Sequence, residues 1–217
     1  MTDPQRPAAP APSTLSFSAP DDSDELARAE LYGLLSRLWL AAPDADLLQQ
    51  FAVAVTEAPQ RGALLEGPWH DLVAAMRATT PERAADEYEA LFLGVGKPEV
   101  FVYGSYHLSG FLHERPLADL RADLAALGLT RDRDRGETED HVAYVLEVMR
   151  YLIAGDDVAV CNLEQQRRFF RAHVQTWVER LCDAVDAHPR ADTWRAVAGF
   201  TRAFVQVETQ GFDLLES

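Results

Sequence analysis

Hydrophobic residues recur at intervals of three and four along most of this chain, with polar residues between them. This spacing places the hydrophobic side chains on one face of an α-helix. Proline, glycine and N-capping residues separate each periodic segment from the next. Helices are predicted to begin near residues 24, 44, 68, 80, 105, 116, 139, 158 and 192. The pattern therefore predicts an all-α fold of about eight or nine helices without a sequence repeat.

The longest periodic segment covers residues 158–187 and is predicted to be one continuous helix. Its hydrophobic stripe consists of Leu163, Phe170, Val174, Trp177, Val178 and Leu181. The two cysteines, Cys161 and Cys182, would then lie roughly 30 Å apart along the helix, beyond the reach of a disulfide. We expect both to be free thiols in a reducing compartment.

Two segments lack the helical period. Residues 97–106 include a strand-like run with no partner strand, so a packed loop is expected there. Residues 130–136 alternate arginine and aspartate, which predicts a solvated connection. It would form a lobe boundary near 129–138 inside a single helical domain covering 21–217, and a hinge for exchange of lobes between chains. Residues 1–20, rich in proline, alanine and serine, are expected to be a disordered tail.

Composition narrows the classes of function. The 217 residues are 47% hydrophobic and 25% charged, as in ordinary globular proteins, and carry a net charge of −15. This charge disfavours nucleic acid and anionic membrane surfaces, and favours a basic or strongly apolar partner. The sequence shows no signal peptide and no apolar run long enough to span a membrane, so we expect a cytoplasmic protein without membrane insertion.

The main candidate for a functional site is the acidic segment 136–141, directly before the amphipathic segment 142–153. Thr138 is predicted as the helix N-cap, which places Glu139 and Asp140 in the first turn, with His141 one residue later. A metal site could be formed by Glu137, Asp140 and His141 together with one distant histidine, namely His107, His113 or His173. However, the sequence contains no His-x-x-x-His pair and no motif for nucleophilic catalysis or nucleotide binding. The residues therefore predict a binding module rather than an enzyme, with no catalytic residue, metal or cofactor.

Three local patterns resemble one protein family. They are Glu137-x-x-Asp140-His141; Tyr88-x-x-Leu91-Phe92; and the series Glu164-Gln165, Phe169-Phe170, His173 and Trp177. In this order they resemble the TorD/DmsD family of cytoplasmic chaperones that mature molybdenum-containing redox enzymes. The chain departs from the family pattern at two positions, where Glu139 and Thr176 replace prolines. Glu139 adds a negative charge at the start of the predicted helix.

The resemblance implies a TorD-like helical fold and a non-catalytic chaperone. Such a protein binds the twin-arginine signal peptide of an apo-molybdoenzyme, delays its export and keeps it receptive to the cofactor. The client would be of the formate dehydrogenase or S-/N-oxide reductase type, and the chaperone a monomer or a domain-swapped homodimer. The candidate signal-peptide residues are Glu137, Glu139, Asp140, His141, Tyr106, Phe101, Tyr103 and Leu146. Two alternatives remain: a small helical metal-dependent hydrolase that uses His141, and an assembly factor that binds the mature redox subunit without reading a signal.

Overall fold

The computed structural model describes residues 22–55, 64–94, 96–131 and 136–215. Over these residues it contains ten α-helices, one π-helical turn and no β-strand, so the predicted all-α fold is confirmed. The elements are α1 (Asp22–Leu40), α2 (Ala45–Val53), α3 (Glu66–Ala78), α4 (Pro81–Tyr88), η1 (Glu89–Leu93), α5 (Gly104–Ser109), α6 (Arg115–Ala126), α7 (Val142–Ala154), α8 (Leu163–His173), α9 (Val178–Asp186) and α10 (Thr193–Leu214). The predicted tail and part of the predicted hinge lie outside the described residues.

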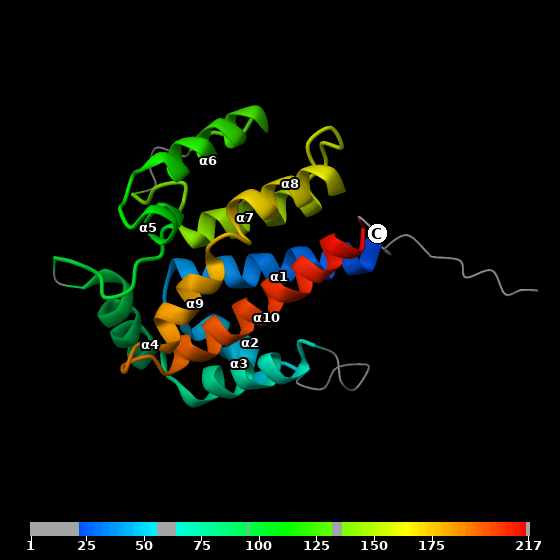
Figure 1. Cartoon of the computed structure of the whole chain (residues 1–217). Helices are drawn as coiled ribbons and strands as arrows, with labels where there is room; N and C mark the ends of the chain where they lie inside the picture. Colours follow the sequence, from blue (N-terminus) through cyan, green and yellow to red (C-terminus); the bar gives the residue numbers. More distant parts are fainter. Residues whose placement is uncertain (1–21, 56–63, 95, 132–135, 216–217) are drawn as a thin grey trace, which may run out of the picture.

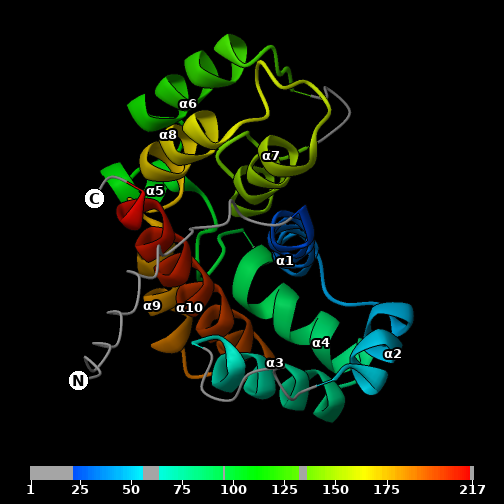
Figure 2. The same cartoon turned by 90° about the vertical axis from the view of Figure 1, so that its right-hand side faces the viewer.

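The core forms where α1 packs along α7 and where α10 packs against α3 and α9. Figures 1 and 2 show α6 and α8 on one side of α1 and α7, with α2 and α3 on the other. Several large aromatic side chains are fully buried between these helices, including Tyr32, Trp39, Phe170, Trp194, Phe200 and Phe204. Trp39 also donates a hydrogen bond from Nε1 to Thr201 Oγ1 on α10, at 3.0 Å. The periodic hydrophobic faces predicted from the sequence therefore meet in one core.

The prediction of one helix over 158–187 is wrong. The chain makes a turn after α8, and α9 begins only at Val178, which raises the helix count from the predicted eight or nine to ten in the described part of the chain. At this turn the buried Trp177 ring stacks on His107, with ring centroids 5.7 Å apart. The ring also lies against Gly104, where an added Cβ would come within 3.0 Å of it. Burial of the indole against α5 explains why the chain bends despite its helical periodicity. Cys161 lies before α8 rather than on a helix with Cys182, and both thiols are free.

A π-helical turn ends the segment predicted as a simple helix near residue 80. Thr80 caps α4 as expected, and residues Glu89–Leu93 then widen into η1, which buries Leu91 and Phe92. Gly94 follows with φ of 58°, and a side chain there would overlap the backbone carbonyl of Lys97. The packed loop predicted over 97–106 is present up to Tyr103, but its last three residues belong to α5, which begins at Gly104. The backbone at residue 94 needs glycine, because other residues seldom adopt positive φ.

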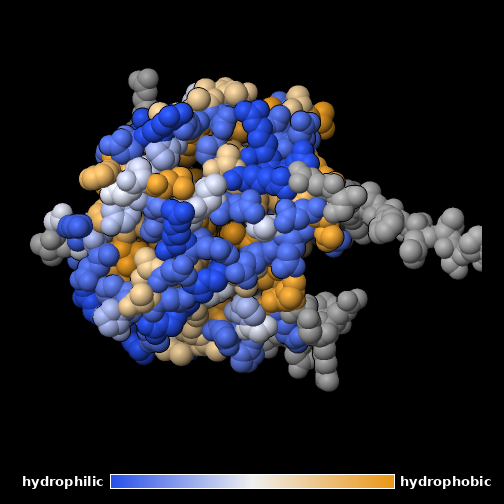
Figure 3. All heavy atoms as spheres, viewed as in Figure 1, coloured by the Kyte–Doolittle hydropathy of each residue, from blue (hydrophilic) through white to orange (hydrophobic). Residues whose placement is uncertain are grey.

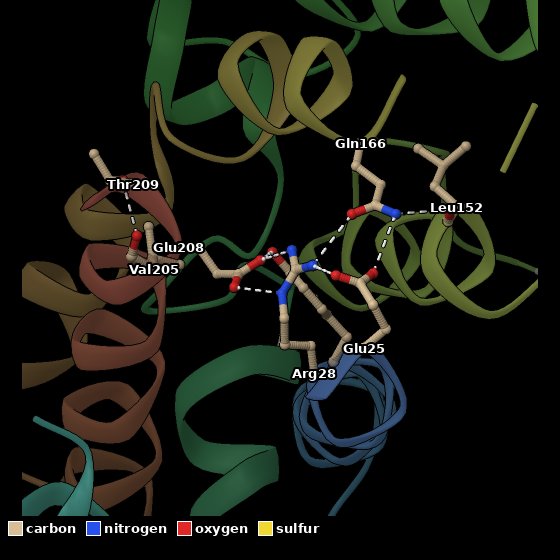
Figure 4. Close-up of polar contacts among 8 residues, drawn as sticks. Glu25, Arg28, Leu152, Gln166, Val205, Glu208 and Thr209 are labelled. Carbon is tan, nitrogen blue, oxygen red and sulfur yellow. Dashed lines mark hydrogen bonds and ion pairs between the residues drawn. The ribbon is translucent and has the colours of Figure 1, made fainter. Parts of the chain in front are cut away.

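A buried polar cluster joins α1, α8 and α10; it comprises Glu25, Arg28, Tyr32, Gln166 and Glu208 and is called the α1–α10 polar cluster below. The Arg28 guanidinium donates to both carboxylate oxygens of Glu208, at 2.9 and 2.7 Å. Figure 4 shows Arg28 between Glu208 on one side and Glu25 and Gln166 on the other. Tyr32 donates its hydroxyl to Glu208 at 2.9 Å, and burial raises its pKa. The cluster fixes how α10 crosses α1.

The outer surface is mostly polar on the face drawn in Figure 3, where small hydrophobic patches are surrounded by hydrophilic residues. Among the described residues, no helix is both long and apolar enough to cross a membrane.

Candidate functional site

The acidic segment 136–141 leads into α7 in a way the sequence did not predict. The N-cap of α7 is His141, not Thr138, and its Nδ1 accepts a hydrogen bond from the Ala143 N–H at 3.2 Å. Glu139 and Asp140 therefore precede the helix. The cause is an antiparallel bridge between Tyr103 and His141, which holds His141 in an extended conformation directly after a turn at residues 139 and 140. A long-range pairing of this kind outweighs a local capping preference.

Asp140 is buried, with 3% of its surface exposed. Its Oδ2 accepts a hydrogen bond from the Ser105 N–H at 2.9 Å, at the start of α5, and its Oδ1 accepts one from the Thr138 hydroxyl at 2.6 Å. The backbone carbonyl of Asp140 also accepts a bond from the Gly104 N–H. Both carboxylate oxygens thus point into the protein, where they join the 136–141 segment to α5. Asp140 holds this part of the site in position rather than facing a ligand.

His141 is equally buried, between the rings of Tyr103 and Tyr144. Burial lowers its pKa to about 4, and the nearby carboxylates of Glu137 and Asp140 oppose this shift only in part. The imidazole is therefore neutral at neutral pH. It acts as a cap and a packing group rather than as a cationic site.

Protonation of His141 should destabilise the fold at mildly acidic pH. The unfolded chain takes up this proton near pH 6.5 and the folded chain only near pH 4, so stability from the neutral imidazole is present above pH 6.5 and lost as the pH falls. We expect a loss of about 2 kcal/mol in unfolding free energy between pH 7 and pH 5. Urea unfolding at both pH values should show a smaller loss in His141→Gln. His70→Gln, which replaces an exposed histidine, is the control. If wild type and both variants lose the same unfolding free energy between pH 7 and pH 5, the loss does not come from His141.

The aromatic candidates gather beside this segment. Tyr103 donates a short hydrogen bond to the Glu137 carboxylate, and burial raises the pKa of its phenol. Phe101 and Tyr106 stack with centroids 4.0 Å apart, and all three rings are partly exposed. Leu146 is different: it is fully buried in the core, so its proposed contact with a ligand needs correction. Residues on the face of α7 opposite Leu146 reach the surface instead.

A groove with a volume of about 550 Å³ lies between α1, the end of α6 and α7. It is called the α1–α7 groove below, and its apolar lining comes from Leu40, Leu124, Leu129, Tyr144, Val148 and Tyr151. Charged residues at its edge are Arg37, Arg131, Glu139 and Glu147. The groove thus combines an apolar surface with two carboxylates and two guanidinium groups. Only Glu139 was identified from the sequence.

Glu139 connects the acidic segment to this groove. Its carboxylate side chain is 12% exposed and accepts hydrogen bonds from Nε and Nη2 of Arg121 on α6, at 3.0 and 2.8 Å. Burial raises the pKa of Glu139, but the guanidinium outweighs this effect and the net shift is downward. Glu147, on α7, is held by Arg150 in the same manner, at 2.6 Å. Both groove carboxylates therefore already bind a guanidinium of the chain.

The lining residues of α7 were missed because they looked like the polar side of a core helix. Tyr144, Glu147, Val148 and Tyr151 recur at intervals of three and four, opposite the buried stripe. Two tyrosines and a valine on an expected solvent face are the signal that could have indicated a groove.

The residues considered for a metal site do not come together. No group of three potential metal ligands converges among the described residues. His173 instead contacts Asp123 on α6 at 2.8 Å, and His107 contacts the Phe101 carbonyl at 2.7 Å. The rings of His107 and His173 therefore already have partners within the protein.

Comparison with known proteins identifies the family. The model of the nitrate reductase delta subunit family matches residues 59–183, more than half of the chain. The TorD chaperone of Aliivibrio fischeri is 25% identical over 203 residues, covering 84% of this chain and 93% of the relative. TorD of Vibrio cholerae is 27% identical over 141 residues, covering 62% of this chain and 64% of the relative. These matches and the all-α fold show that the chain belongs to the nitrate reductase delta subunit family, together with the TorD-type chaperones of molybdoenzyme maturation.

Proposed function

We propose that this molybdoenzyme-maturation chaperone acts in the cytoplasm by binding the twin-arginine signal peptide of an apo-subunit in the α1–α7 groove. Bound there, the signal is withheld from export while the cofactor is inserted. The client is an oxidoreductase of the formate dehydrogenase or S-/N-oxide reductase type. The observation that carries the proposal is Glu139, a shielded carboxylate that binds a guanidinium at the edge of an apolar groove.

The groove matches the chemistry of such a peptide. Arginine pairs with carboxylates through several charge-assisted hydrogen bonds, and an apolar segment needs an apolar surface beside them. Glu139 and Glu147 supply the carboxylates, while Tyr144, Val148 and Tyr151 supply apolar surface. The net charge of −15 attracts a basic segment from a distance.

The remaining candidate residues take supporting parts in this proposal. Glu137 is partly exposed and offers a further carboxylate, bonded to Tyr103. Phe101 and Tyr106 extend the aromatic surface beside it. Asp140 and His141 hold the segment that carries Glu139 and contribute through its position.

A direct test compares a synthetic peptide that carries an Arg-Arg pair before an apolar run with its Lys-Lys version. We expect the Lys-Lys peptide to bind about tenfold more weakly, because lysine cannot make the bidentate contact. Titration calorimetry or fluorescence anisotropy measures both affinities. Glu139→Gln should weaken binding of the Arg-Arg peptide, while Glu179→Gln on the distant α9 should not. Absence of binding by both peptides would refute the proposal.

A second candidate function is supported by the family match itself, whose description refers to a nitrate reductase subunit. On this proposal the chain binds the mature part of the redox subunit without reading its signal. A client from which the signal has been removed separates the two. Binding that survives the truncation favours the second function, and binding that is lost favours the first.

A further inference from the structure

We infer that Arg121 is a built-in competitor of the client, because its guanidinium occupies the Glu139 carboxylate that an incoming arginine must bind. The inference rests on the proposed function and deepens it. The client's arginine would bind by exchange: Arg121 leaves Glu139, turns to solvent, and the client's guanidinium takes its place. Arg121 would then set how tightly, and how selectively, basic peptides enter the α1–α7 groove.

The two partners differ in exposure in the way an exchange requires. The Glu139 side chain is 12% exposed, whereas the Arg121 side chain is 48% exposed. The carboxylate is therefore held by its surroundings while the guanidinium lies at the surface. Both bonds from Arg121 go to one oxygen, Oε2, so the guanidinium does not make the fork geometry that uses both carboxylate oxygens. A client arginine that uses both oxygens would form the stronger pair.

The second groove carboxylate, Glu147, is also paired with an arginine of the chain, although here the carboxylate and the guanidinium side chains are about equally exposed, at 46% and 43%. Arg150 donates to both oxygens of Glu147, and its aliphatic stem lies over Gly33 of α1, where a Cβ would come within 2.9 Å of Arg150 Cδ. Two carboxylates that line one groove are thus each neutralised by a guanidinium of the chain itself. The occupant that fits best is a segment with arginines beside apolar residues, which can replace these contacts and cover the apolar lining.

Neutralisation of the groove has a consequence for specificity. Without these two pairs, the Glu139 and Glu147 carboxylates would be offset only by Arg37 and Arg131 of the lining, and the acidic protein would discriminate less among basic segments. With these pairs, a ligand must replace hydrogen bonds that already exist, and a lysine replaces them poorly. Arg121 and Arg150 would therefore weaken the binding of peptides that cannot replace their hydrogen bonds.

The test is to remove Arg121 and measure binding of the synthetic Arg-Arg peptide. We expect Arg121→Gln to bind it about two- to fivefold more tightly at low ionic strength, since an exposed ion pair is lost before binding. The difference should shrink as salt is added. The matched control is Arg115→Gln on the same helix. Among the described residues Arg115 pairs with Asp119, at 3.6 Å, and it lies outside the groove lining. The variant changes net charge equally and should leave the affinity within error.

The double variant Arg121→Gln/Glu139→Gln identifies the carboxylate concerned. Its affinity for the Arg-Arg peptide should fall below that of Arg121→Gln, because the carboxylate that the loss of Arg121 would free is itself removed. Equal binding by wild type and Arg121→Gln overturns the exchange but leaves the proposed function standing. Equal gains in Arg121→Gln and Arg115→Gln also overturn it, since net charge then explains the effect. If neither wild type nor Arg121→Gln binds, the proposed function itself fails.

Discussion

Replacing Arg28 by alanine is expected to lower the free energy of unfolding by about 3–4 kcal/mol. The reason is the buried Glu208 carboxylate, whose side chain is only 6% exposed and which would keep Tyr32 as its sole hydrogen-bond partner in the α1–α10 polar cluster. Urea unfolding followed by circular dichroism measures the change. The loss is large because the remaining Glu208 charge has little access to solvent, not because the ion pair itself is strong.

Two further variants test this explanation. Arg171→Ala also removes an arginine that joins α8 to α10, but the Arg171–Asp213 pair is much more exposed, and a loss below about 1 kcal/mol is expected. The double variant Arg28→Met/Glu208→Leu removes both charges and should recover much of the stability lost in Arg28→Ala. A loss in the double variant as large as in the single one would show that packing, not the stranded charge, is responsible.

Replacing Asp140 by alanine is expected to cost about 2–3 kcal/mol of unfolding free energy. The buried Ser105 N–H would lose its acceptor, and the Thr138 hydroxyl would lose its partner. Asp140→Asn keeps one acceptor oxygen and should cost less. Chemical unfolding of both variants gives the comparison. For control, Asp71→Ala removes an exposed carboxylate from α3 and should stay within about 0.5 kcal/mol of wild type.

Stability and peptide binding of the Asp140 variants together distinguish two roles for this residue. If Asp140 only positions the segment, the folded Asp140→Asn variant should bind the Arg-Arg peptide with an affinity close to wild type. Stability that does not change in Asp140→Ala, together with lost binding, would show instead that its carboxylate faces the ligand. The buried geometry favours the positioning role.

Arg28 and Asp140 both make buried contacts that hold the helices around the α1–α7 groove in place. The α1–α10 polar cluster fixes one end of α1, while Asp140, just before α7, accepts a hydrogen bond from the Ser105 N–H of α5. The groove walls are thus held by buried polar contacts, and the groove carboxylates are held by exposed arginines. A rigid groove whose charged groups exchange easily suits a chaperone that must bind its client and later release it.

Much of the fold followed from the sequence because it depends on local chemistry. The hydrophobic periodicity located every helix from α1 to α7 and α10, although α3 begins two residues before the predicted start. Asp44 and Thr80 cap α2 and α4 as predicted, and Gly128 adopts positive φ after α6. The local motifs also indicated the family that the comparisons show.

The candidate site was predicted only in part. The sequence identified Glu139 as an unusual acidic residue, but its partner Arg121 is 18 residues away along the chain and on another helix. Asp140 and His141 were expected in the first turn of a helix and in contact with a ligand, but pairing with residues 102–104 buries them. Leu146 was assigned to the ligand surface although it belongs to the core stripe.

The sequence by itself determined the all-α class, the position of most helices, the acidic charge and the family resemblance, because each depends on neighbouring residues or on composition. The tertiary structure decided where α7 starts, that the 158–187 segment divides at Trp177, and that Glu139 lies on a groove with Arg121. These features depend on contacts between segments far apart in the chain. Burial of Trp177 against Gly104, and of Asp140 against Ser105, outweighs local preferences of about 1 kcal/mol or less per residue, so the local pattern revealed neither the division near Trp177 nor the start of α7.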